Sequence, residues 1–215
     1  MVYQLYYYPR SASLLPHMLL HHMSLEYQLV LVDKRKHAQK SCDYLKLNPA
    51  GRIPTLVDDG LVIFETPAIC IHLCEQHSEY DLIPVMGSSK RPLFFQWLSY
   101  LNNTLQVELM IRFYPHRHTT DNTNIGSIIA AQNIRIRDIL LLIDEQLSDR
   151  RYLLGNKISA CDFYLFMLAG WALSIEPSPL SYIHLGPYLK SLVNHPTIKS
   201  VYKEEGISLQ KVLED

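Results

Sequence analysis

The sequence lacks the features that mark membrane-spanning and nucleic-acid-binding proteins. It contains no apolar run of about eighteen residues, so no segment is expected to span a bilayer. Its net charge is −1, so no excess of charge favours nucleic acid or an anionic membrane as a partner. The chain starts without a charged segment, an apolar segment and a cleavage site, and we therefore expect a cytoplasmic protein.

Cysteine is also scarce, which excludes a disulfide framework. Cys70 and Cys74 are four residues apart in an apolar segment, where packing of two small thiols is favoured over a metal site. His116 and His118 lie in a polar stretch, where a solvated pair is favoured over a weak metal site. We therefore expect no metal. The four cysteines are Cys42, Cys70, Cys74 and Cys161.

What the sequence does contain is enough apolar residues, 48% of 215, for one large domain or two small ones. Its first part alternates the period of a strand with that of a helix. A strand–helix–strand start that leads to a hairpin and a further helix is typical of a thioredoxin-like α/β domain. We expect strands at 2–8, 27–32, 54–57 and 61–64, and helices at 11–22, 40–47 and 67–77.

The second part of the sequence has helical periodicity only. Residues 80–90 carry Pro, Gly and Ser without any period and are predicted to be a linker. Long helices are expected at 92–113 and 125–147, within an all-helical domain at 91–215. Ser159 and Asp162 are spaced as the N-cap and N3 residues of a capping box, which predicts that another helix begins there.

The most informative segment is 48–56, Asn-Pro-Ala-Gly-Arg-Ile-Pro-Thr-Leu. Asn-Pro and the following Gly form turns, and Pro54 is tolerated at the first residue of a strand. If the Ile53–Pro54 bond is cis, the N–H and C=O of Ile53 face away from the sheet, toward a peptide-like ligand.

Glu65 and Thr66 form a second informative pair, where a predicted strand ends and a helix begins. A hydroxyl and several free N–H groups at a helix N-terminus make a ready site for a carboxylate.

Together these segments closely resemble the glutathione-binding half of the glutathione transferase family, and with the capping box the resemblance covers nearly the whole chain. It implies that the backbone of Ile53, before Pro54, pairs with the cysteinyl unit of glutathione. It implies that Glu65 binds the ammonium of the γ-glutamyl end and that Thr66 binds its carboxylate. It further implies glutathione as the co-substrate, a thioredoxin-like domain at 1–79 and a homodimer.

The turn before the first helix resembles that of the bacterial beta class of the family, but it departs from that class at two positions. Ala12 stands where the class has Cys, and Gln106 stands where it has His. Without that thiol the chain cannot form a mixed disulfide with glutathione there, so thioltransferase chemistry loses its nucleophile.

Activation of the glutathione thiol by a hydroxyl remains possible, because a thiol needs a hydrogen-bond donor to act as a thiolate near neutral pH. We expect the donor to be Ser11, then Ser13, then Tyr7, in that order. Either serine is alternatively a helix N-cap, and Tyr7 is alternatively a strand residue packed under the site. Arg10 either adds positive potential or is simply solvated.

Further contacts with the ligands are predicted from other segments. Lys36 or His37 is expected to meet the glycyl carboxylate of glutathione, although a run of charge is often only a solvated face. Side chains of the first long helix are expected to face the cleft between the domains, where both substrates bind, although helix packing explains the apolar ones equally well. These are Asn103 and Gln106 on the glutathione side, and Phe113 and Tyr114 at a hydrophobic substrate site.

The sequence therefore favours a cytoplasmic glutathione transferase of detoxification type, which conjugates the thiolate to small hydrophobic electrophiles. The alternative is a non-catalytic protein on the same scaffold. It would carry glutathione or a hydrophobic ligand, or regulate transcription like the stringent starvation proteins that contact RNA polymerase. A maleylacetoacetate isomerase is a weaker alternative, since Ser11-Ala12-Ser13 only partly resembles the turn of those enzymes.

Overall fold

The computed structural model describes residues 2–210 and divides the chain into two compact units. The first unit extends to Val85 and also includes Asn194–Leu209, and the second runs from Met86 to Val193. The first unit thus takes in a C-terminal segment that the sequence analysis left in the helical domain. The domain limits 1–79, 80–90 and 91–215 stay predictions.

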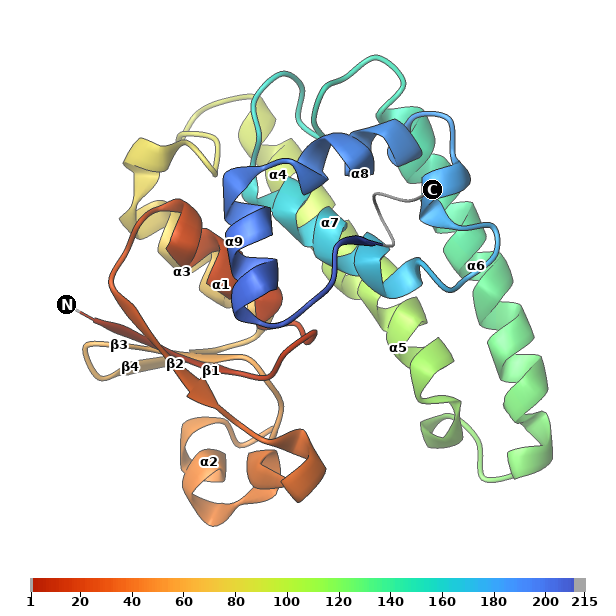
Figure 1. Ribbon diagram of the computed structural model, residues 1–215, viewed down its shortest axis with the longest axis horizontal. Coiled ribbons are helices and arrows are strands. Elements are labelled where there is room, and N and C mark those ends of the chain that lie inside the picture. Colours follow the sequence, from red (N-terminus) through yellow and green to blue (C-terminus); the bar gives the residue numbers. More distant parts are fainter. Residues whose placement is uncertain (1, 211–215) are drawn as a thin grey trace. The chain divides into compact units, whose positions relative to one another are not determined.

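The first unit has four strands and several helices, and its strands and α-helices up to Gln76 lie near the positions expected from the sequence (Figure 1). Two short 3-10 helices, Lys34–Lys36 and Ala38–Lys40, precede α2. The helix expected from residue 11 begins three residues later, because 8–13 form a turn. The elements are β1 (Tyr3–Tyr7), α1 (Leu14–His22), β2 (Tyr27–Leu31), α2 (Cys42–Leu47), β3 (Thr55–Asp58), β4 (Leu61–Phe64), α3 (Thr66–Gln76) and α9 (Pro196–Glu204).

The four strands form one mixed sheet in the order β2-β1-β3-β4. β1 is parallel to β2, with Leu5 opposite Leu29, and antiparallel to β3, with Leu5 opposite Leu56. The hairpin β3–β4 completes the sheet. This arrangement, with α1 and α3 on one face and α2 on the other (Figure 1), confirms the predicted thioredoxin-like fold.

Apolar side chains of the strands and helices build the core of this unit. Leu5 and Leu56 are fully buried, because residues that point to one face of a pleated sheet meet the helices that cover it. Cys70 and Cys74 are buried on α3 and form no disulfide. No cluster of three metal-ligating side chains occurs within residues 2–210.

In its described part the second unit is helical. The first predicted long helix is continuous but changes its winding, because Leu101–Gln106 form a π-helical segment between α4 and α5. Nothing in the apolar period signals that change. The helices are α4 (Lys90–Tyr100), α5 (Val107–Phe113), α6 (Ile125–Gln146), α7 (Ala160–Ala172) and α8 (Leu185–Val193). No helix within 2–210 is long and apolar enough to cross a membrane.

The predicted capping box begins α7. Ser159 and Asp162 form the reciprocal pair, and the Ser159 N–H donates to Asp162 Oδ2 over 2.7 Å. The Asp162 carboxylate also accepts the Leu153 N–H at 2.9 Å and the Tyr188 hydroxyl at 2.7 Å. Burial raises the pKa of the Asp162 carboxyl, and these donated bonds act in the opposite direction. The box therefore anchors a loop and α8 as well as the start of α7.

Candidate functional site

The turn between β1 and α1 is closed by a buried serine. Ser13 Oγ donates to the Tyr8 carbonyl at 3.2 Å and accepts the Tyr8 N–H at 3.3 Å. Ser13 is fully buried and occupies the N-cap position of α1 without making a side-chain cap bond. Its hydroxyl proton is therefore committed to holding the turn together.

Ser11 lies beside it and is also buried, with 7% of its surface exposed against 0% for Ser13. Ser11 Oγ accepts the Ser13 N–H at 3.3 Å and lies 2.9 Å from Ser13 Oγ. Since the Ser13 proton goes to Tyr8, the Ser11 proton completes this pair. Rotation of the Ser11 hydroxyl would free its proton for another acceptor and leave the bonds between Ser13 and Tyr8 in place, whereas the same rotation at Ser13 would break a bond that closes the turn.

The backbone of Ala12 adds a further donor. Among the described residues, no acceptor is bonded to the Ala12 N–H, which lies just before α1. The first N–H groups of a helix lack intrahelical partners and attract negative charge. A thiolate at this turn would meet one free N–H and one rotatable hydroxyl.

Tyr7 ends β1, just before the turn. Burial raises the pKa of its phenol, and the charges of Glu205 and Glu204 raise it further. The phenol is therefore held in its neutral form, which can donate a hydrogen bond. Its part in activating a thiol stays a prediction.

The start of α3 lies against the same turn. Thr66 is buried, and its Oγ1 donates to the Ala12 carbonyl at 3.4 Å. Glu65 precedes it with φ +74° and ψ +118°, a conformation that L-residues rarely adopt, and its side chain is exposed. The structure thus brings the predicted helix-start pair and the predicted thiol turn together.

The second predicted segment has the expected backbone. The Ile53–Pro54 bond is cis, and β3 begins at Thr55, so Ile53 lies outside the sheet ladder. Within residues 2–210 neither the N–H nor the C=O of Ile53 has a hydrogen-bond partner. The backbone N–H and C=O of Ile53, which we call the Ile53 edge, are therefore open to a ligand.

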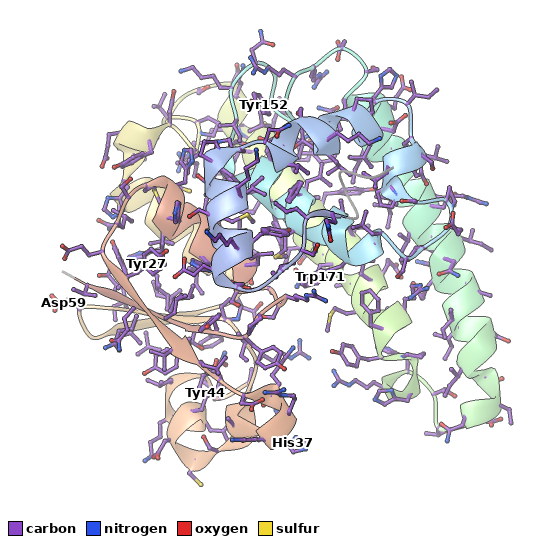
Figure 2. All side chains as sticks on the ribbon, viewed as in Figure 1. Tyr27, His37, Tyr44, Asp59, Tyr152 and Trp171 are labelled. Carbon is purple, nitrogen blue, oxygen red and sulfur yellow. The ribbon has the colours of Figure 1, made fainter. Side chains whose placement is uncertain are left out.

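A buried polar network fixes that edge. Tyr44 Oη donates to the Arg52 carbonyl at 2.6 Å, and Asn48 Nδ2 donates to the same carbonyl at 2.9 Å. Because the Tyr44 proton is used there, the Thr55 hydroxyl donates to Tyr44 Oη at 2.9 Å. Figure 2 shows Tyr44 between α2 and the sheet. The sequence analysis missed this role of Tyr44, although its position four residues before Asn48 on a helix was a usable signal.

Replacing Tyr44 by phenylalanine is expected to destabilise the protein by about 1–2 kcal/mol, because the Arg52 carbonyl and Thr55 hydroxyl lose a partner. Binding of a ligand at the Ile53 edge should weaken as well. Urea unfolding and calorimetry would measure both effects. Tyr6→Phe is the matched control, since the Tyr6 ring lies 5.9 Å from that of Tyr44 and its hydroxyl bonds no described residue. Equal effects from both changes would contradict this role.

Lys36 and His37 are exposed in the 3-10 segments before α2, and no described contact joins them to the turn. Lys34 is nearer, with Nζ 4.7 Å from the centre of the Tyr8 ring. The part of Lys36 and His37 in binding therefore stays a prediction.

The remaining candidates belong to the second unit. Tyr164 is fully buried, and its Oη lies 2.7 Å from Gln106 Oε1 and 2.9 Å from Asn102 Oδ1, so its one proton is donated to one of these oxygens. Asn103 is exposed. The Arg112 guanidinium lies 5.6 Å from the centre of the Phe113 ring, and the Arg117 guanidinium lies 4.2 Å from the centre of the Tyr114 ring. Their roles toward a ligand stay predictions.

Two family models match the chain. "Glutathione S-transferase, N-terminal domain" matches residues 12–76, and "Glutathione S-transferase, C-terminal domain" matches residues 107–196. Among curated proteins, glutathione S-transferase GstA of Escherichia coli O157:H7 is 26% identical over 206 residues, covering 95% of this chain and 99% of that protein.

Solved structures agree with these matches. BphK, described as a bacterial GST in a ternary complex, is 30% identical with a TM-score of 0.82, covering 95% of this chain and 100% of its own. A sphingomonad glutathione S-transferase complexed with glutathione is 28% identical with a TM-score of 0.83 and the same coverage. A bacterial beta class enzyme of Sphingomonas chungbukensis is 26% identical with a TM-score of 0.83, again at that coverage.

Proposed function

This chain belongs to the glutathione S-transferase family, a family of transferases, and we propose that it binds glutathione and transfers its sulfur to a hydrophobic electrophile. The observation that carries the proposal is the hydrogen bond from Thr66 to the Ala12 carbonyl. It joins the two predicted ends of the glutathione site, the helix start and the thiol turn. Similar structures that contain glutathione support the choice of ligand.

The γ-glutamyl and cysteinyl parts of the tripeptide have matching groups in the first unit. The Glu65 carboxylate suits the ammonium, and the Thr66 N–H at the N-terminus of α3 suits the γ-glutamyl carboxylate, because the Thr66 hydroxyl proton already goes to the Ala12 carbonyl. The open peptide edge at Ile53, before Pro54, suits the cysteinyl unit. The Ala12 N–H and the Ser11 hydroxyl suit the sulfur, and Ser13 holds them in place.

The reaction with an activated aryl chloride shows the electron balance. The thiol gives its proton to solvent, and the thiolate attacks the ring carbon to form a C–S bond. The C–Cl bond then breaks and chloride leaves. The donors at the turn lower the free energy of the thiolate, which is the form that reacts. Ala12 carries no thiol, so the protein itself is neither oxidised nor reduced.

Ser11→Ala tests this assignment. We expect kcat/KM with the aryl chloride to fall by about 100-fold, because the sulfur loses its rotatable donor. The thiolate absorbance of bound glutathione should titrate at a higher pH than in the wild type. Ser13→Ala should instead lower the unfolding midpoint, because it opens the turn. If Ser11→Ala leaves both kcat/KM and the thiolate titration unchanged, hydroxyl activation is contradicted.

A non-catalytic glutathione-binding protein is the second candidate. The observation in its favour is that the Ser11 and Ser13 protons are both used inside the turn. Calorimetric binding of glutathione without turnover of a broad panel of electrophiles would support this candidate over the enzyme.

We also propose that the protein is a cytoplasmic homodimer. The apolar side chains exposed on the edge strand β4 support an interface, since exposed apolar edge strands tend to pair with a partner. These side chains are Leu61, Val62 and Phe64.

A further inference from the structure

A buried acid–histidine pair lies behind the thiol turn. Glu205 follows α9, and His17 lies on α1, and the side chains of both are fully buried. Glu205 Oε1 is 2.8 Å from His17 Nδ1. A buried carboxylate is costly unless it is paired, so this contact holds the end of α9 against α1.

The second oxygen of the same carboxylate reaches the turn itself. Glu205 Oε2 accepts the Arg10 N–H at 3.2 Å. Arg10 has φ +60°, which a residue with a Cβ adopts only when its surroundings hold it there. Arg10 directly precedes Ser11 and Ala12, so its backbone angles set the direction of the groups that follow.

The other nitrogen of His17 fixes the orientation of the ring. His17 Nε2 lies 3.2 Å from Tyr27 Oη and 3.2 Å from Glu204 Oε2. Tyr27 is the first residue of β2 and is labelled in Figure 2. When Nε2 accepts from Tyr27, the ring proton is on Nδ1 and is donated to Glu205. When Nε2 donates to Glu204, Nδ1 also donates to Glu205 only if both ring nitrogens carry a proton. The Glu205 bond to the Arg10 N–H is present in either case.

The opposite end of α9 has its own anchor. His22 Nδ1 is 3.1 Å from Thr197 Oγ1, so α9 is attached to α1 near both of its ends. Glu205 is thus held in place by the helix before it. Its carboxylate can act as a fixed point for the turn.

We propose that Glu205 is a positioning residue for the thiol site. Its carboxylate bridges His17 and the Arg10 N–H and so holds the turn in the conformation that presents the Ser11 hydroxyl and the Ala12 N–H. The link to glutathione rests on the proposed function, whereas the link to the turn does not. Glu205 touches no reacting atom in this scheme and acts only through the backbone of Arg10.

The kinetic test uses Glu205→Gln and Glu205→Ala, with Glu204→Gln as the matched control. Glu204 also contacts His17, but it makes no bond to the turn. Glu205→Ala should raise the KM for glutathione about tenfold, while the KM for the aryl chloride stays within about twofold. Glu205→Gln keeps one acceptor oxygen and should show a smaller rise. If Glu205→Ala does not fold, Glu205→Gln carries the test.

A second readout does not need glutathione. Amide hydrogen exchange of the peptide that contains residues 8–13 should be faster in the Glu205 variants than in the wild type and in Glu204→Gln. If the wild type fails to bind glutathione, the proposed function is wrong, and this exchange measurement still decides the role of Glu205.

Thr197→Ala separates positioning from simple stability, because it loosens the other end of α9 and leaves Glu205 in place. We expect it to lower the unfolding midpoint without raising the KM for glutathione. The proposal is overturned if Thr197→Ala raises that KM as much as the Glu205 variants do. It is also overturned if those variants keep wild-type exchange at residues 8–13.

Discussion

Asp162→Asn should destabilise the protein by about 3 kcal/mol, although the change replaces one oxygen by one nitrogen. In the wild type both carboxylate oxygens face only donors: the N–H groups of Leu153 and Ser159 and the hydroxyls of Ser159 and Tyr188. An asparagine NH2 group would point at two of these donors in a fully buried place. Urea denaturation followed by tryptophan fluorescence would measure the loss.

Ser159→Ala is the matched control for this prediction. It removes the capping hydroxyl but leaves the Leu153 and Tyr188 donors paired, so we expect a loss of only about 1 kcal/mol. If Asp162→Asn costs no more than Ser159→Ala, Asp162 is only a helix cap and does not join α8 and the preceding loop to α7.

Glu65→Gly should raise the stability of the protein while it removes most of the affinity for glutathione. Glycine adopts φ +74° without the steric cost that a Cβ brings, and we expect a gain of about 1 kcal/mol. The proposed partner of the ligand ammonium is lost, so the Kd for glutathione should rise by about thirtyfold. Thermal unfolding and calorimetry on the same sample would measure the two opposite effects.

Glu65→Gln separates the two contributions. It keeps the backbone conformation and removes the charge, so affinity should fall without any gain in stability. If Glu65→Gly binds glutathione as tightly as the wild type does, the assignment of the ammonium site to Glu65 is wrong.

Local sequence signals predicted the fold and the local backbone of the candidate site. The spacing of apolar residues predicted the strands and most helices of the thioredoxin-like unit, because that spacing follows from which face of a strand or helix is buried. The turn at Asn48, the open edge at Ile53 and the helix start at Thr66 were predictable for the same reason, because each depends on residues close together in the chain.

The sequence by itself determined the two-part architecture and the membership of the family. It also determined three local features of the candidate site, which are the Ile53 edge, the start of α3 and the turn before α1. The tertiary structure alone decided which hydroxyl proton holds the turn together. It also placed Glu205 against His17, 188 residues away in the chain. The physical reason is that the use of each proton, and the pairing of a buried charge, depends on groups that meet only when distant segments pack together.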